Sequence, residues 1–396
     1  MSDVPCNGCG KISSSGSVYC TSCGRRLDGV EEGVRCNGCG KISNEGNVYC
    51  TTCGRLMCCE RSAREGHIYC TTCGRRTDGT QDGAPRSYVP EKKDLFSHSH
   101  PLIVFAGLAL LLGCVPMLVF EMGAVFWAMP GVISGMEGWS LGIMFLLPTP
   151  VYLFYISGTV ALFYYLFLVA AVVVSFMLLI YNSREGLADL FRKKTDKLND
   201  MPLYSVVTLF AMYISISLIL ILLVNALGYE PATLDDPAEP WMLWYALLNA
   251  SVWEEVICRV LMIGVPLMIA AVALKEKGAW KRLFGKGEMD RFAIVFILIS
   301  SAVFAFGHLQ GWDLFKLIPT FISGLALGYL FVKYGLYASI MMHFLIDYMS
   351  SVTWIFGSGA AETMLGLFIL FVMIAGLPFI LVYAKRGYEH FRKTLL

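Results

Sequence analysis

The chain has 396 residues, of which 56% are hydrophobic and 15% are charged, and its formal net charge is +1. Soluble domains are about 45–50% apolar and about 25% charged, so this composition excludes a single water-soluble globule. The balanced charge also argues against a protein built to bind nucleic-acid phosphates, and we expect no nucleic-acid partner. Twelve of the 14 cysteines lie between Cys6 and Cys73, whereas the apolar excess begins near Pro101. The chain therefore combines a polar, cysteine-rich head with a hydrophobic body.

The head contains a repeat in which two CxxC motifs are separated by ten residues, and its first two copies lie 30 residues apart. Each CxxC places two thiolates on one tight turn, and two such turns complete a tetrahedral four-thiolate zinc site. A module this small cannot bury a core, so bound zinc must supply its folding free energy. The copies resemble short zinc ribbons. The predicted ligands of structural Zn²⁺ are Cys6, Cys9, Cys20 and Cys23 in the first copy and Cys36, Cys39, Cys50 and Cys53 in the second.

A third copy departs from this pattern, because Leu56 stands where the repeat would have its first cysteine. The ligands that remain are Cys59, Cys70 and Cys73. Cys58 and His67 are the two candidates for a fourth ligand, and a degenerate site without one stays open. We expect the ribbons to recruit a substrate or a protein partner.

The body contains eight apolar stretches that approach the roughly 20 residues needed to cross a bilayer as a helix. They are residues 101–121, 158–182, 203–228, 241–273, 291–308, 314–333, 336–356 and 362–384. The sequence thus predicts an all-α polytopic membrane protein with about eight transmembrane helices, preceded by small tandem β zinc ribbons. Glu121, at the end of the first stretch, is expected at the membrane interface.

Residues 122–157 are also apolar, but Pro and Gly interrupt them, which favours a re-entrant or interfacial segment. Within this segment GWSLG, around Ser140, matches the G-x-S-x-G pattern of serine hydrolases. It lacks the strand–turn–helix context that gives such a match meaning, and we interpret it as a turn.

The distribution of Lys and Arg indicates how the body lies in the membrane. Cations follow the second, fourth and eighth stretches, whereas residues 122–157 contain none and residues 229–240 are acidic. Cytoplasmic loops are enriched in Lys and Arg, so we expect a multi-pass protein of the cell membrane with both termini in the cytoplasm. That compartment is reducing, and zinc thiolates outlast disulfides there.

Six ionisable side chains fall on three of the predicted spans. They are Glu254, Glu255 and Arg259 on the fourth, His308 at the end of the fifth, and His343 and Asp347 on the seventh. A charge in hydrocarbon costs about 2.5–3.5 kcal/mol on insertion scales, so each is a candidate functional group. Glu255 and Arg259 are spaced to pair on one helix face, whereas Glu254 is turned away by about 100°. Around one cavity, a carboxylate and an imidazole would hold a water molecule for hydrolysis.

These residues carry a resemblance to a family. EExxxR lies at Glu254–Arg259, FxxxH at Phe304 and His308, and HxxxD at His343 and Asp347. In this order on membrane helices, the motifs resemble those of the CAAX-prenyl-protease and bacteriocin-processing (CPBP) family of intramembrane endopeptidases over residues 201–360.

The resemblance implies a peptidase that acts in or beside the bilayer on a protein or peptide, with or without a lipid group. It assigns water activation to Glu254 and His308, and an oxyanion pocket to His343 and Asp347. Glu255 and Arg259 would brace the site, and Phe304 would pack beside it. The predicted divisions are 1–27, 33–56 and 57–76 for the ribbons, 77–100 for a linker, 101–200 for the first transmembrane segments, 201–360 for the protease core and 361–396 for the last helix and tail.

One residue departs from the family pattern, since Asp347 stands where members that cleave CAAX sequences commonly have Asn. An ionised Asp cannot donate a hydrogen bond to an oxyanion. We favour a glutamate-activated water without a catalytic metal. The alternatives are a zinc metallopeptidase that uses Glu254, His308 and His343, a catalytically silent scaffold that presents the ribbons, and a proton-coupled transporter.

Overall fold

A computed structural model describes the structure of residues 4–5, 12–13, 34–35, 42–43, 100–146, 149–192, 194–195, 198–229, 239–310 and 314–395. The chain divides into two compact units, Met1–Lys92 and Lys93–Leu396.

In the first unit the same small hairpin occurs twice. Strand β1 (Val4–Pro5) pairs antiparallel with β2 (Ile12–Ser13), and β3 (Val34–Arg35) pairs in the same register with β4 (Ile42–Ser43). The two hairpins are 30 residues apart, as the repeat is. The cysteines predicted to bind zinc lie outside the described residues, so the ribbons and their zinc stay a prediction.

The second unit is mostly helical, and six of its described helices are long and apolar enough to cross a membrane. They are α2 (Pro101–Gly135), α3 (Gly158–Phe191), α4 (Pro202–Ala226), the run Pro240–Ala273 that ends in α6 (Val265–Ala273), the run of η6 (Leu314–Lys316) and α8 (Leu317–Tyr334), and α11 (Gly359–Leu395). The expected count of eight is not confirmed. The other two predicted spans correspond to α7 (Arg291–Gly307) and α9 (Leu336–Tyr348), which have 17 and 13 residues.

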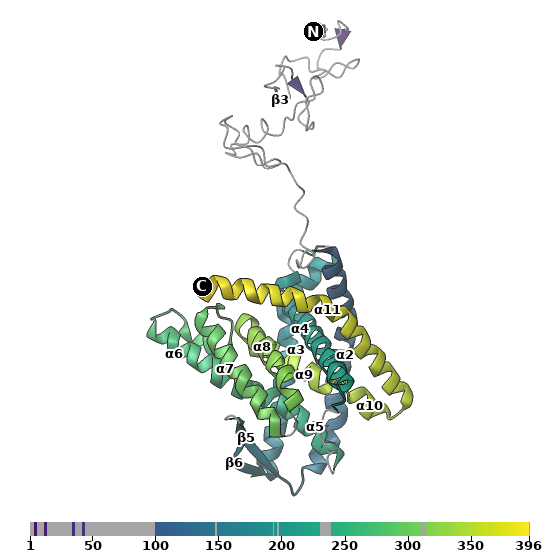
Figure 1. Ribbon diagram of the computed structural model, residues 1–396, viewed down its shortest axis with the longest axis vertical. Helices are drawn as coiled ribbons and strands as arrows, with labels where there is room; N and C mark the ends of the chain where they lie inside the picture. Colours follow the sequence, from purple (N-terminus) through teal and green to yellow (C-terminus); the bar gives the residue numbers. More distant parts are fainter. Residues whose placement is uncertain are drawn as a thin grey trace. The chain divides into compact units, whose positions relative to one another are not determined.

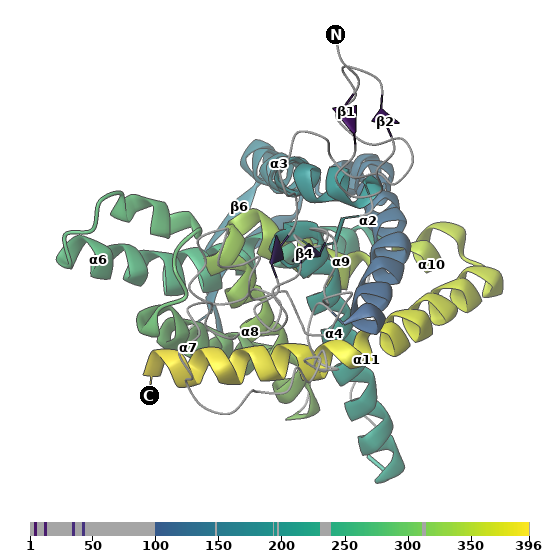
Figure 2. The same cartoon turned by 90° about the horizontal axis from the view of Figure 1, so that it is seen from above.

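Helix α4 organises the packing of this unit. It contacts α2, α3, α8, α9 and α11, which lie around it in Figure 1. Every residue from Pro202 to Ser215 in α4 is buried. Figure 2 shows α6 and α10 (Ser351–Phe356) on opposite sides of the unit. The short helix α9 packs on α3, α4 and α8, so protein surrounds the polar residues that it carries.

The segment after the first predicted span differs from the sequence expectation. Helix α2 continues to Gly135, so Glu121 lies inside it and is fully buried rather than at an interface. Next comes an antiparallel hairpin of β5 (Ser140–Leu146) and β6 (Pro150–Ser157). The all-α prediction for the body was therefore wrong here. The indole Nε1 of Trp253 donates a 2.7 Å hydrogen bond to the Met144 carbonyl and ties β5 to the helices.

The fourth predicted span is a single helical run with irregular hydrogen bonding. It begins as α5 (Pro240–Asn249), passes through the π-helical segments η2 (Ala250–Glu254) and η3 (Val256–Gly264), and ends as α6. Hydrogen bonds from i to i+5 widen a helix and are frequent at functional sites. In this chain the π-helical hydrogen bonds occur around the two adjacent carboxylates, Glu254 and Glu255.

Close packing of α4 on α11 gives a testable prediction. A Cβ at Gly376 would collide with the Ala211 carbonyl and the Ser215 hydroxyl, which itself donates to the Met373 carbonyl at 2.8 Å. We expect Gly376→Ala to lower the free energy of unfolding by about 1–3 kcal/mol, the usual cost of overpacking. Gly366→Ala on the same helix is the control, because nothing lies within 4 Å of its added methyl group. Thermal unfolding of the purified variants measures both, and equal melting temperatures would contradict the packing.

Candidate active site

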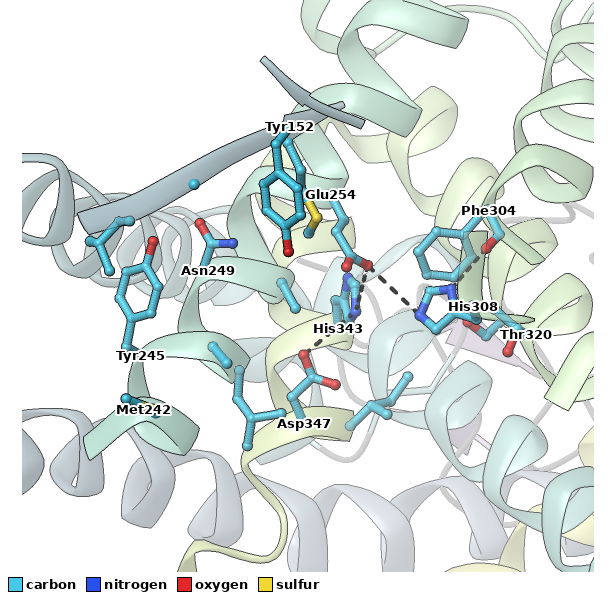
Figure 3. Close-up of a pocket in the computed structure, with 18 of the residues that line it drawn as sticks. Tyr152, Met242, Tyr245, Asn249, Glu254, Phe304, His308, Thr320, His343 and Asp347 are labelled. Carbon is cyan, nitrogen blue, oxygen red and sulfur yellow. Dashed lines mark hydrogen bonds and ion pairs between the residues drawn. The ribbon is translucent and has the colours of Figure 1, made fainter. Parts of the chain in front are cut away.

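A cavity of about 540 Å³ lies between the β5–β6 hairpin and the helices, as Figure 3 shows in close-up. Four of the predicted catalytic side chains line it: Glu254, His308, His343 and Asp347. They come from η2, from η5 (His308–Gln310) directly after α7, and from α9, elements that are well separated in the sequence. Only 8% of Glu254 and 5% of His343 is exposed. The cavity thus presents a concentrated set of polar groups to little solvent.

Glu254 is central in this set. Its Oε2 lies 3.9 Å from His308 Nε2 and 4.0 Å from His343 Nε2 (Figure 3). Both distances are too long for a direct hydrogen bond, and Oε2 is buried without a hydrogen-bond partner among the described residues. A water molecule at ordinary hydrogen-bond distance can contact Glu254 and one imidazole at once. The arrangement therefore suits a carboxylate that holds and deprotonates water.

A backbone carbonyl and a second carboxylate fix the orientation of the two imidazole rings. His308 Nδ1 lies 2.8 Å from the Phe304 carbonyl, which can only accept, so Nδ1 carries the hydrogen. His343 Nδ1 lies 3.0 Å from Glu255 Oε1. In each ring the other nitrogen, Nε2, is directed to Glu254. This is the orientation that a carboxylate or carbonyl partner normally imposes on a functional histidine.

The neighbouring carboxylate, Glu255, has a different environment. Arg259 Nε donates a 3.1 Å hydrogen bond to Glu255 Oε2, and both side chains are fully buried. Arg259 also donates to the Ser300 hydroxyl at 3.1 Å, and its guanidinium lies over the ring of Phe304, 4.9 Å from the centroid. Glu255 thus joins Arg259 to His343. The spacing in the sequence predicted the pair with Arg259. It did not predict the link to His343, which depends on the packing of η2 and η3, on either side of Glu255, against α9.

Asp347 lies on the same face of α9 as His343. Its Oδ2 is 3.5 Å from His343 Nε2 and accepts a 3.0 Å hydrogen bond from the Ser251 hydroxyl. Ser251 was not predicted as a site residue. Its position three residues before Glu254, which is close to one helical turn, could have indicated that it lies on the same helix face.

The rest of the cavity wall could not have been found from the motifs. Tyr152 of β6 and Tyr245 of α5 line it, as do Lys316 and Thr320 at the start of the helix that contains α8. The hairpin residues carried no such signal, because the hairpin itself was not predicted. Ser140 also lines the cavity, at the first position of β5, and none of its described contacts makes it a nucleophile.

The proposed metallopeptidase can be tested against the distances. Zinc–ligand bonds of 2.0–2.1 Å in a tetrahedral site place the ligand atoms about 3.3–3.4 Å apart. The distances from Glu254 to the two imidazoles are wider, and the described residues contain no group of three His, Cys, Asp or Glu placed to hold a metal ion. In this arrangement Glu254 lies too far from both imidazoles for the three side chains to share one zinc ion.

Comparison with known proteins gives a match to one family model over the part of the chain that carries the site. No curated protein and no solved structure matches the chain. The matched family is one of membrane peptidases, which agrees with a body of several apolar helices and supports a multi-pass membrane protein. The match includes all seven residues of the three motifs. The matched family is that of type II CAAX prenyl endopeptidases described as Rce1-like, and the match covers residues 236–349.

Proposed function

We propose that the protein is an intramembrane endopeptidase that hydrolyses a peptide bond with water activated by Glu254. Its substrate is a protein or peptide in or at the membrane, with or without a lipid group. One observation carries the proposal: the buried Oε2 of Glu254 faces His308 and His343 in a cavity and has no hydrogen-bond partner among the described residues. Glu255 is unsuited to the same role, because Arg259 and His343 already engage its oxygens.

The reaction follows from the roles that these groups can take. A water held between Glu254 and His308 loses a proton to Glu254 and attacks the carbonyl carbon of the peptide bond. Negative charge then develops on the carbonyl oxygen, where an N–H or O–H donor stabilises it most. His343, when charged, presents Nε2–H to this oxyanion while Glu255 holds Nδ1. Glu254 returns its proton to the leaving amine as the C–N bond breaks, which yields a carboxyl group and a free amine.

Asp347 is the second group assigned to the oxyanion, and it donates only while protonated. An amide donates at every pH, so we expect Asp347→Asn to cleave peptide at close to the rate that the wild type reaches with this carboxyl protonated, and to keep that rate as rising pH deprotonates the native carboxyl group. Asp347→Leu should lower the rate by about 10²–10³-fold, the usual cost of losing one oxyanion donor. Rates measured across pH for the three proteins test this. An Asn variant as slow as the Leu variant would mean that the reaction needs a carboxylate here.

The remaining parts of the proposal concern the head and the location. Zinc bound by the cysteines of the ribbons folds the head, which recruits the substrate or a partner protein. The protein resides in the cell membrane with both termini in the cytoplasm, and no catalytic metal is involved. The uneven distribution of Lys and Arg along the body supports this orientation.

The test of the function is peptide cleavage by the full chain in liposomes. Prenylated and unprenylated peptides are incubated with the protein, with a chelator and without it, and mass spectrometry identifies the products. We expect cleavage that survives chelation. A chain without the head serves as the control for the zinc of the ribbons. If this shortened chain still cleaves the peptide, and the chelator abolishes cleavage in it as in the full chain, the result would favour the zinc metallopeptidase. No cleavage of any peptide would favour the scaffold, and ion flux through the liposomes would favour the transporter.

A further inference from the structure

The cavity lies toward one face of the membrane-spanning unit. The residues that line it include Trp139 and Ser140 at the start of the hairpin, Trp241 at the start of α5, and Lys316 at the start of the run that contains α8. In Figure 1 the hairpin and α5 lie at one end of the unit, opposite the end where α2 begins and α11 finishes. The order of the chain agrees with this placement. Consecutive spans alternate in direction, so the hairpin that follows α2 lies at the end opposite to the start of α2.

The two faces differ sharply in charge. At the face away from the cavity, residues 274–291 contain six Lys and Arg, and residues 385–393 contain four. At the cavity face, residues 136–157, 227–241 and 349–361 contain none, and Lys316 is the single cation in residues 308–316. Lys316 lines the cavity and does not belong to a loop. Since cytoplasmic loops are the ones enriched in Lys and Arg, the cavity face is the extracytoplasmic face.

The hairpin has a surface that suits this placement. Five consecutive residues of β6, Val151–Tyr155, are each 48–65% exposed and are all apolar or aromatic. A strand in water would alternate, with one face polar. Aromatic side chains with polar tips gather where a bilayer meets water, so β6 fits the interface of the outer leaflet. Tyr152 belongs both to this strand and to the cavity wall, which brings the interface to the mouth of the cavity.

We infer that the cavity opens to the extracytoplasmic side and takes its peptide there. The substrate class is then a peptide segment at the outer surface of the membrane, such as the stretch next to a transmembrane anchor or part of an exported chain. A lipidated tail on the cytoplasmic side would face the wrong end of the site. That a peptide is cut rests on the proposed function, whereas the side to which the cavity opens does not.

Cysteine labelling tests the side directly. Ser140→Cys places a thiol of nearly the same size at an exposed position of the cavity mouth, and Lys277→Cys places one in an exposed loop at the other face. A membrane-impermeant maleimide is added to intact cells that produce the full chain, and mass spectrometry reads each position, because the head has twelve further cysteines. Cys114 and Cys258 are buried and should stay unlabelled.

We expect labelling of position 140 in intact cells, and labelling of position 277 only after permeabilisation. The reverse pattern would overturn the inference, whether or not the protein cleaves peptides.

A second experiment uses an impermeant peptide that the protein cuts in liposomes. This peptide is added to intact cells that produce either the wild-type or the Glu254→Gln protein. Cleavage in the medium of intact wild-type cells, but not of intact Glu254→Gln cells, supports the inference. Cleavage that appears only after permeabilisation overturns it. Failure to cut any peptide in liposomes, with position 140 labelled from outside, would instead count against the proposed function alone.

Discussion

Replacing Glu254 by glutamine is expected to slow peptide cleavage by about 10²–10⁴-fold, the range that general acid–base groups contribute. The amide keeps the shape of the side chain, but it cannot take a proton from water. Its contacts change little, because Oε2 has no hydrogen-bond partner among the described residues to lose. The loss should therefore appear in kcat, with KM close to its wild-type value.

The measurement is the initial rate of peptide cleavage in liposomes, with the melting temperature recorded for each protein. Glu362→Gln is the matched control, since it makes the same chemical change at the exposed start of α11. A Glu254→Gln protein that cleaves as fast as this control would remove Glu254 from the mechanism. An equal loss in both variants would point to a general effect of charge on the preparation.

The second large effect is expected from Arg259→Met, which leaves Glu255 as a buried charge without its cation. Removing one partner of a buried ion pair typically costs about 3–5 kcal/mol, because the other charge remains desolvated. The variant also exposes His343 to a carboxylate that Arg259 no longer holds in place. We expect a markedly lower melting temperature together with reduced cleavage.

Thermal unfolding in detergent measures this, and Arg184→Met provides the comparison. Arg184 and Glu185 form an exposed ion pair at 3.8 Å, and such pairs contribute about 0–1 kcal/mol. The double variant Glu255→Leu, Arg259→Met should recover part of the lost stability, because no unpaired charge remains. If Arg259→Met proves as stable as Arg184→Met, then Glu255 is not the buried partner that the structure describes.

The motif residues could be predicted from the sequence for a specific physical reason. Ionisable side chains are costly in hydrocarbon, so those on the fourth, fifth and seventh apolar stretches stood out against an apolar background. Spacing within one helix also indicated that Arg259 pairs with Glu255 and that Glu254 turns elsewhere. These inferences needed only local geometry.

Other features depend on contacts between distant segments, which no local pattern records. The link from Glu255 to His343 and the hydrogen bond from Ser251 to Asp347 each join a residue of the fourth stretch to α9. The hairpin escaped prediction because β6 is apolar on both faces and therefore shows no alternation. Glu121 was misplaced because a charge was taken to end a span, whereas packing buries it inside α2.

The shortness of helix α9 has a consequence for the supply of water. At 1.5 Å per residue, the 13 residues of α9 extend about 20 Å, against a hydrocarbon layer of about 30 Å. By itself α9 is therefore about 10 Å too short to cross this layer, and the polar side chains His343 and Asp347 that it carries line the cavity. Hydrolysis consumes one water per bond, and bulk hydrocarbon holds almost none. The water that is consumed must therefore come through the cavity, whose wall this short helix helps to form.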